Sequence, residues 1–295
     1  MPNITVCLSF DVDAVSSWIG TAKSNDPSTV SRGEFSVVGT PRVVNLLKRL
    51  DIQATFCIPG HTAYAFPDLV RMIRDEGHEI GHHGWVHENP ADFDKAGEIR
   101  ILEKGLEALE RVAGVRPVGY RSPAVNLSHD TLKLLTQYGF EWDSNCFAND
   151  FYPYYPRTGD KWGLDEPYQF GEVLDLVEMP VSHVLGDFSA FETIPGFFPG
   201  YVPPRTLEGM WKDDFDFAVN ECPDGVFILT MHPQTIGRGS RIRMLERFIQ
   251  YARENADVTF TTMGGYARSW RAANPLEEWK QKNPMRTGVH AITKV

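Results

Sequence analysis

The chain has few cysteines, no long apolar run and no signal-like start. Its four cysteines, Cys7, Cys57, Cys146 and Cys222, form no Cys-x-x-Cys pair. This spacing favours a reduced compartment over a disulfide framework. No apolar stretch approaches the roughly 18 residues of a membrane span, and no basic segment followed by an apolar one opens the chain. We therefore expect a soluble, cytoplasmic protein.

Positive charge is also sparse. Lys and Arg total 29 against 39 Asp and Glu, the formal net charge is -10, and no Lys/Arg run is longer than a pair. Nucleic acids and anionic membranes are therefore poor candidate partners. The 295 residues are enough to bury a large core, as one barrel-sized domain or two ordinary ones.

Strand-like and helix-like segments alternate along most of the chain. The predicted strands are Ile4–Phe10, Ala54–Ile58, His78–His82, Val118–Arg121, Glu141–Ser144, Leu174–Val181, Val226–Met231 and Val258–Thr261. The predicted helices are Pro41–Leu50, capped by Thr40, Pro67–Glu76, Lys95–Ala113, Ser128–Tyr138, Thr206–Glu221, Arg241–Asn255 and Gly265–Ala272. Seven or eight strand–helix units without a linker predict one α/β domain, a parallel barrel over residues 1–274. A charged, peripheral tail is expected at 275–295.

Three longer segments interrupt the alternation. Trp18–Gly39 is a polar loop, whereas Asn145–Pro167 and Leu185–Pro204 are rich in aromatic residues. At a barrel mouth such aromatic loops can line a pocket, pack against another subunit of a homo-oligomer, or cap the barrel. We take three aromatic residues as candidate substrate contacts: Trp18, Trp85 and Tyr155.

Polar residues that suit a metal site follow two of the predicted strands. Asp11-Val12-Asp13 ends the first apolar run, and His83 and His87 follow a later one. Alternate residues of a strand point the same way, so Asp11 and Asp13 face one site. A carboxylate and two imidazoles suit a divalent ion of borderline softness and leave a position open for water. The second carboxylate is then free to take a proton. The alternative is that the two Asp and the two His are turn or surface residues that do not share a site.

Other polar residues also end strands. His232 directly follows the predicted strand Val226–Met231. It is suited to act as a general acid, and the alternative is a histidine packed in the core. Arg121 either pairs with Asp11 or forms a salt bridge at the rim. Asp143 either orients Arg121 or a histidine, or is structural. His82 alternates away from His83 and is a supporting or core residue.

These motifs resemble the polysaccharide deacetylase family, carbohydrate esterase family four. Their order is Asp-x-Asp, His-x-x-x-His, Arg-x-Pro, a strand-end Asp and Leu-x-x-His. The separation of the two Asp by Val12 resembles a cytoplasmic subgroup with peptidoglycan-deacetylase-like proteins, allantoinase-like proteins and cyclic imide hydrolases. The resemblance implies a distorted (β/α) barrel of about seven strands. It also implies Asp11 as base, His232 as acid, and Asp13, His83 and His87 as ligands of Zn²⁺, with Co²⁺ or Ni²⁺ as alternatives.

The expected activity is metal-dependent hydrolysis of a non-peptide carbon–nitrogen bond. The family expectation is N-deacetylation of an acetylated sugar or glycan. A small cyclic imide or ureide is the alternative substrate and suits a cytoplasmic protein. A binding or assembly protein with little catalysis is the alternative from another class.

Overall fold

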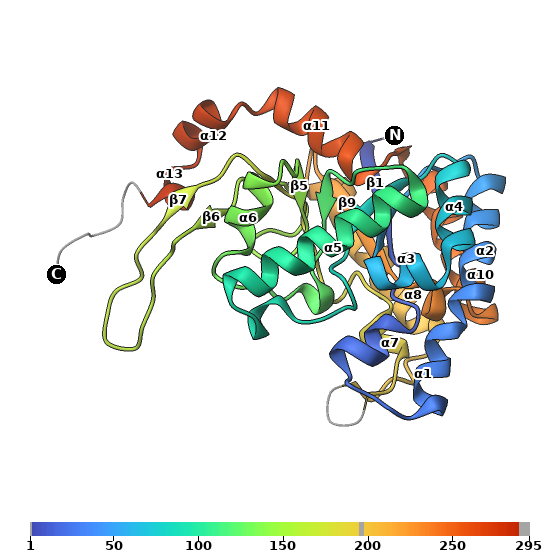
Figure 1. Cartoon of the computed structure of the whole chain (residues 1–295). Helices are drawn as coiled ribbons and strands as arrows, with labels where there is room; N and C mark the ends of the chain where they lie inside the picture. Colours follow the sequence, from blue (N-terminus) through green and yellow to red (C-terminus); the bar gives the residue numbers. More distant parts are fainter. Residues whose placement is uncertain (1, 195–197, 289–295) are drawn as a thin grey trace.

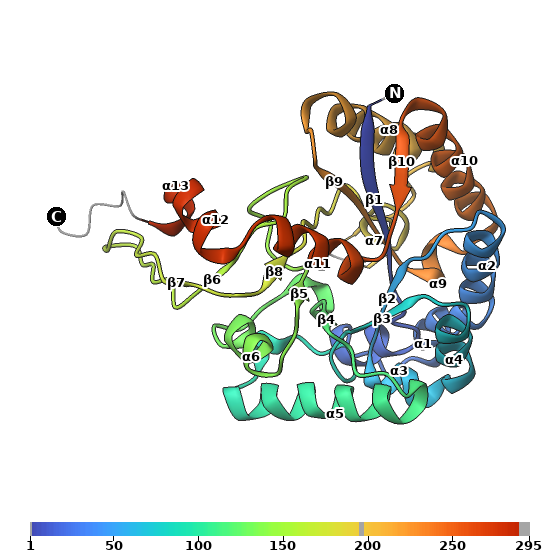
Figure 2. The ribbon, with the colours of Figure 1, turned by 90° about the horizontal axis from the view of Figure 1, so that it is seen from above.

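The centre of the protein is a curled parallel sheet (Figures 1 and 2). The computed structural model describes residues 2–194 and 198–288. The sheet strands are β1 (Asn3–Asp11), β2 (Thr55–Ile58), β3 (Glu79–His82), β4 (Gly119–Tyr120), β5 (Trp142–Asp143), β8 (Val177–Glu178), β9 (Val226–Met231) and β10 (Asp257–Phe260). Seven of them follow the order β10-β1-β2-β3-β4-β5-β8, and β9 pairs with β1.

Strand β1 organises the sheet because three strands pair with it. Its first half pairs with β10 and its last residues with β2, while β9 pairs along Thr5–Phe10. Every one of these pairings is parallel, so the carboxyl ends of the strands meet at one edge. Beyond β8, a single parallel bridge joins Gly186 to Thr230 of β9. The predicted distorted (β/α) barrel is confirmed.

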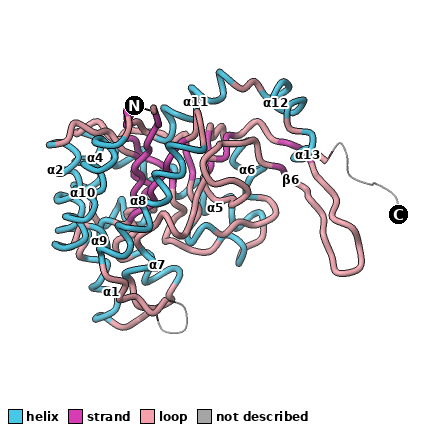
Figure 3. The backbone as a smooth tube through the Cα atoms, turned by 180° about the vertical axis from the view of Figure 1, so that it is seen from behind, coloured by secondary structure: helices cyan, strands magenta, loops and turns pink. Residues whose placement is uncertain are grey.

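Helices surround the sheet, except that the last two lie to one side of it, near the C-terminus (Figure 1). They are α1 (Pro27–Glu34), α2 (Ser36–Arg49), α3 (Gly60–Ala65), α4 (Pro67–Asp75), α5 (Lys95–Ala113), α6 (Thr131–Gln137), α7 (Phe188–Phe191), α8 (Pro204–Glu221), α9 (Pro233–Ile236), α10 (Gly239–Asn255), α11 (Met263–Ala273), α12 (Leu276–Lys282) and α13 (Pro284–Thr287). Short turns are η1 (Ser17–Thr21, a π-helix), η2 (Pro90–Asp92) and η3 (Pro123–Val125). A separate hairpin, β6 (Arg157–Thr158) and β7 (Glu172–Val173), continues into a projecting loop (Figure 3).

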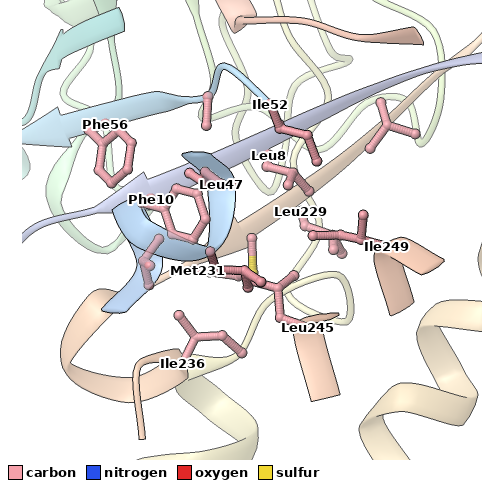
Figure 4. Close-up of a cluster of buried hydrophobic side chains, with 14 of the residues drawn as sticks. Leu8, Phe10, Leu47, Ile52, Phe56, Leu229, Met231, Ile236, Leu245 and Ile249 are labelled. Carbon is pink, nitrogen blue, oxygen red and sulfur yellow. The ribbon is translucent and has the colours of Figure 1, made fainter. Parts of the chain in front are cut away.

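Apolar side chains between the sheet and the outer helices form the main core (Figure 4). Phe10 and Phe56 stack at 4.9 Å between ring centroids. Leu8, Leu229 and Leu245 are at most 1% exposed. Burial of such side chains is the dominant stabilising term, and here it holds β1, β2 and β9 in fixed positions. Within residues 2–194 and 198–288, no helix has the length and apolarity needed to cross a membrane.

Two predictions about the N-terminal third were wrong. Helix α2 begins at Ser36, so Thr40 is not its cap and Pro41 lies inside it. Pro41 removes only its own N–H bond, to the carbonyl of Val37, a residue that is 48% exposed and close to water. The expected loop Trp18–Gly39 holds η1 and α1, and Asp26 caps α1 by accepting hydrogen bonds from the amides of Ser28 and Thr29.

The C-terminal tail is more structured than predicted. Residues 276–287 form α12 and α13, and Trp279 is 6% exposed. Its ring packs edge-on against Tyr155 at 5.4 Å. The tail is held because this large aromatic side chain buries against the barrel. Residues 289–295 of the tail lie outside the described ranges, and the domain boundary at 274 stays a prediction.

Candidate metal centre and active site

The candidate site lies at the edge where the parallel strands end. Asp11 is the last residue of β1, and Asp13 follows two residues later. His83 follows β3, Arg121 follows β4, and His232 follows β9. Parallel pairing therefore brings together residues that are up to 221 positions apart in sequence, as between Asp11 and His232.

Asp13, His83 and His87 form a buried group of potential metal ligands. One donor atom from each lies within 4.8 Å of the others. Asp13 Oδ1 is 3.3 Å from His83 Nε2 and 3.5 Å from His87 Nε2. Asp13 Oδ1 and His83 Nε2 are buried without a hydrogen-bond partner. Unpartnered buried polar atoms are costly in a protein, and a divalent ion satisfies a carboxylate and two imidazoles of this kind.

Contacts behind the imidazoles leave their Nε2 atoms available. His83 Nδ1 lies 2.7 Å from the carbonyl oxygen of Arg121, an acceptor only, so Nδ1 carries the proton. The Thr21 hydroxyl lies 2.6 Å from both the His87 carbonyl and His87 Nδ1. It donates to the carbonyl and accepts from Nδ1. In each ring the lone pair is then on Nε2, which is the arrangement that metal-binding histidines require.

The electrostatics favour ligand protonation states for Asp13 and His87, whereas the carboxylates of Asp11 and Asp13 outweigh burial and raise the pKa of His83. Burial alone raises the pKa of Asp13, but the imidazoles of His87, His83 and His232 around it lower it well below its usual value. Burial lowers the pKa of His87 to about 4. An ionised Asp13 and a neutral His87 are the forms that bind a cation.

A second carboxylate, Asp11, is held by a buried arginine. Arg121 Nη1 donates to Asp11 Oδ1 at 2.9 Å and to Ser9 Oγ at 3.0 Å, while Nη2 donates to Ser144 Oγ at 3.1 Å. Arg121 is fully buried and Asp11 is 3% exposed. The structure thus has the predicted Asp11–Arg121 contact. The pair fixes one oxygen of Asp11 and leaves the other facing the pocket.

His232 is oriented by Asp187, a residue that the sequence analysis missed. His232 Nδ1 donates to Asp187 Oδ1 at 2.8 Å, and the His232 amide donates to Asp187 Oδ2 at 3.1 Å. His232 Nε2 faces Asp11 Oδ2 and Asp13 Oδ2 at 3.9 and 3.8 Å. Burial opposes charge on the ring, but Asp187 and the other carboxylates outweigh it and raise the pKa of His232 to about 9.

Within the described residues, Asp143 makes no direct hydrogen bond to Arg121 or to a histidine. Its side chain accepts a hydrogen bond from Asn145 Nδ2 and lies beside Glu178. Gln234 is another missed neighbour, and its Nε2 donates to Asp13 Oδ2 at 3.3 Å. The position of Gln234 just after His232 was the available signal. No sequence signal marked Asp187 apart from its place in the aromatic loop Leu185–Pro204.

A cavity of about 390 Å³ opens onto these groups. Trp18 lines it, as predicted for a substrate contact. Trp85 instead lines a separate surface hollow, and Tyr155 packs on α12, so the structure brings neither into the cavity. His82 bonds to the Leu102 carbonyl and supports α5.

Comparisons with known proteins agree with this architecture. Residues 28–142 match the polysaccharide deacetylase family. The chain is 35% identical to the peptidoglycan deacetylase of Helicobacter pylori, covering 93% of this chain and 99% of that protein.

Solved structures show the same fold. A Mycobacterium smegmatis protein assigned as a polysaccharide deacetylase matches with a TM-score of 0.81 and 34% identity, covering 92% of this chain and 91% of that one. An allantoinase matches with a TM-score of 0.76 and 23% identity over 92% of this chain and 91% of that one, which is a likeness of fold. With these matches along nearly its whole length, the chain belongs to the polysaccharide deacetylase family.

Proposed function

We propose that the protein is a metal-dependent hydrolase that removes the acetyl group from the nitrogen of an acetylated saccharide. The observation that carries this proposal is the buried Asp13–His83–His87 group, with two unpartnered donor atoms, in one cavity with Asp11 and His232. Family membership supports hydrolysis of an amide bond. The preferred ion is Zn²⁺, because one carboxylate and two imidazoles are typical of a catalytic zinc site.

Asp11 is the proposed general base. When bound, the ion supplies Lewis acidity, polarising the substrate carbonyl and making water more acidic. Asp11 takes a proton from the attacking water as the water oxygen bonds to the carbonyl carbon. Arg121 pairs with Asp11 and holds the direction of its carboxylate through the 2.9 Å hydrogen bond.

His232 is the proposed general acid. As the carbon–nitrogen bond breaks, the departing nitrogen needs a proton, and His232 Nε2 faces the cavity to provide it. The carboxylate of Asp187 stabilises the protonated ring and fixes Nδ1 as a donor. Trp18 forms part of the wall against which the substrate packs.

A small cyclic imide or ureide is the second candidate substrate. Apolar side chains line much of the cavity: Trp18, Val125, Val181, Phe188, Ile194 and Phe198. Several lining hydroxyls are already used within the protein, such as Thr21 toward His87 and Ser122 toward the Asn126 carbonyl. A saccharide presents many hydroxyls, whereas a small imide needs few polar partners in an apolar pocket.

Turnover assays with the zinc-loaded protein separate these possibilities. Acetylated mono- and oligosaccharides, peptidoglycan fragments and chitin form one set, and cyclic imides and allantoin form the other. Acetate release from a saccharide supports the proposal. Ring opening of an imide without acetate release selects the second candidate. If the protein does not retain zinc and turns over neither set of compounds, a binding or assembly role is selected.

A further inference from the structure

Behind Arg121, two buried carboxyl groups face each other on neighbouring strands. Asp143 of β5 and Glu178 of β8 are register partners, and both are fully buried. They lie within hydrogen-bonding reach of each other, and one oxygen of each lies within 4.8 Å of Cys146 Sγ. Neither residue belongs to the metal group or touches the cavity.

Each carboxyl group has one satisfied oxygen and one unsatisfied oxygen. Glu178 Oε1 accepts hydrogen bonds from the amides of Asn145 and Cys146 at 2.7 and 2.8 Å. Asp143 Oδ1 accepts one from Asn145 Nδ2. Asp143 Oδ2 and Glu178 Oε2 are buried without a partner. Two ionised carboxylates would repel here, whereas one proton between them satisfies both oxygens.

We propose that Asp143 and Glu178 share one proton, carried on Asp143 Oδ2, and that this pair positions Arg121. The proton belongs on Asp143 because the two backbone amides stabilise negative charge on Glu178. Burial and the neighbouring Glu178 charge raise the pKa of Asp143 well above its usual value.

The pair reaches the active site through two residues that follow Asp143. Ser144 Oγ accepts the hydrogen bond from Arg121 Nη2 at 3.1 Å. Asn145 donates to Asp143 and, through its Oδ1, accepts from the Ser122 amide at 2.8 Å. The carboxyl pair therefore fixes the turn that holds both the guanidinium of Arg121 and the backbone next to it.

Few other ionisable groups surround the pair. Those that face it from the packed elements are Arg121, Cys146, Tyr120, Tyr154 and, beside Cys146, Arg157. Burial raises the pKa of the Cys146 thiol, which stays protonated and is a poor metal ligand in that form. Protonation of Asp143 leaves a single negative charge in the pair, on Glu178, where the amides of Asn145 and Cys146 donate to it.

The variant Asp143→Asn mimics the protonated pair, because its amide donates to Glu178 where the shared proton lies. Glu98→Gln is the matched control: Glu98 is 1% exposed, but both of its oxygens accept hydroxyl hydrogens from Ser128 and Thr131. In metal-free protein at neutral pH, we expect an infrared carboxylic-acid band that Asp143→Asn lacks and Glu98→Gln keeps. An identical spectrum for wild type and Asp143→Asn would overturn the shared proton.

Stability against pH gives a second readout. The pKa of Asp143 is raised by folding, so its contribution is present below the unfolded pKa and is lost as pH rises. The wild type should therefore lose denaturant resistance relative to Asp143→Asn as pH rises above the ordinary pKa of an aspartate. Parallel curves of stability against pH for wild type and Asp143→Asn would overturn the proposal. A second bound zinc ion in the wild type that is absent from Asp143→Asn would also overturn it.

The positioning role rests on the proposed function and has its own readout. Asp143→Asn should keep kcat, whereas Asp143→Ala should lose kcat by on the order of a hundredfold with KM unchanged, because Arg121 and Asp11 shift. Equal kcat in all three proteins would overturn the positioning role. If the wild type turns over no amide, the proposed function fails while the infrared and stability readouts still decide the shared proton.

Discussion

Replacing Arg121 by methionine measures what the buried ion pair contributes to the active site. The substitution keeps most of the side-chain length but removes the charge and the hydrogen bonds to Asp11, Ser9 and Ser144. Because Asp11 is 3% exposed, little water can reach the oxygen that Arg121 held. The variant leaves a buried carboxylate without its main compensating charge.

The expected loss of stability follows from that burial. Breaking a buried ion pair by removing one partner costs about 3–5 kcal/mol. His232 Nε2 lies 3.9 Å from Asp11 Oδ2, and the raised pKa of His232 keeps positive charge near the carboxylate at neutral pH. We therefore expect the lower end of the range, about 3 kcal/mol in free energy of unfolding.

Urea unfolding of the metal-free protein at neutral pH tests this value. The control is Arg49→Met, which breaks a pair with Glu246 in which Arg49 is 58% exposed and should cost less than about 1 kcal/mol. If the stranded charge is the cause, Asp11→Asn should restore most of the stability of Arg121→Met in the double variant. Additive losses, or a loss no larger than that of the control, would refute the reasoning.

Three further outcomes are expected. Elemental analysis should find about one ion per chain in wild type and in Asp11→Asn, but little in His83→Ala. Asp11→Asn should nevertheless lose turnover. Full metal content in His83→Ala would contradict the ligand assignment. Asp187→Asn removes the charge that raises the pKa of His232 to about 9, so the alkaline fall of kcat/KM should move to lower pH; an unmoved profile contradicts His232 as the acid. Trp279→Ala should cost about 3–5 kcal/mol in urea unfolding while metal content stays unchanged; a negligible cost means that the tail does not stabilise the barrel.

Local patterns were sufficient for many elements. Helix α5 has the predicted bounds, Lys95–Ala113, because its apolar period is regular, Asp94 caps its start and Gly114 ends it with φ of 65°. Strand ends also placed Asp11, Asp13, His83, Arg121 and His232 at one edge, because parallel strands share the direction of their carboxyl ends. Local rules failed at α2, where Pro41 was mistaken for a helix start.

The sequence by itself determined the alternation of strands and helices, the barrel class and the residues that end its strands, since each depends on periodicity and caps within a few residues. Only the tertiary structure decided which partner each side chain meets. Asp187, 45 residues before His232, reaches it because the loop after β8 returns across β9. Asp143 faces Glu178 because β5 and β8 pair. Tyr155 lies outside the cavity and packs against Trp279. Such contacts depend on strand order and loop paths, which no local period encodes.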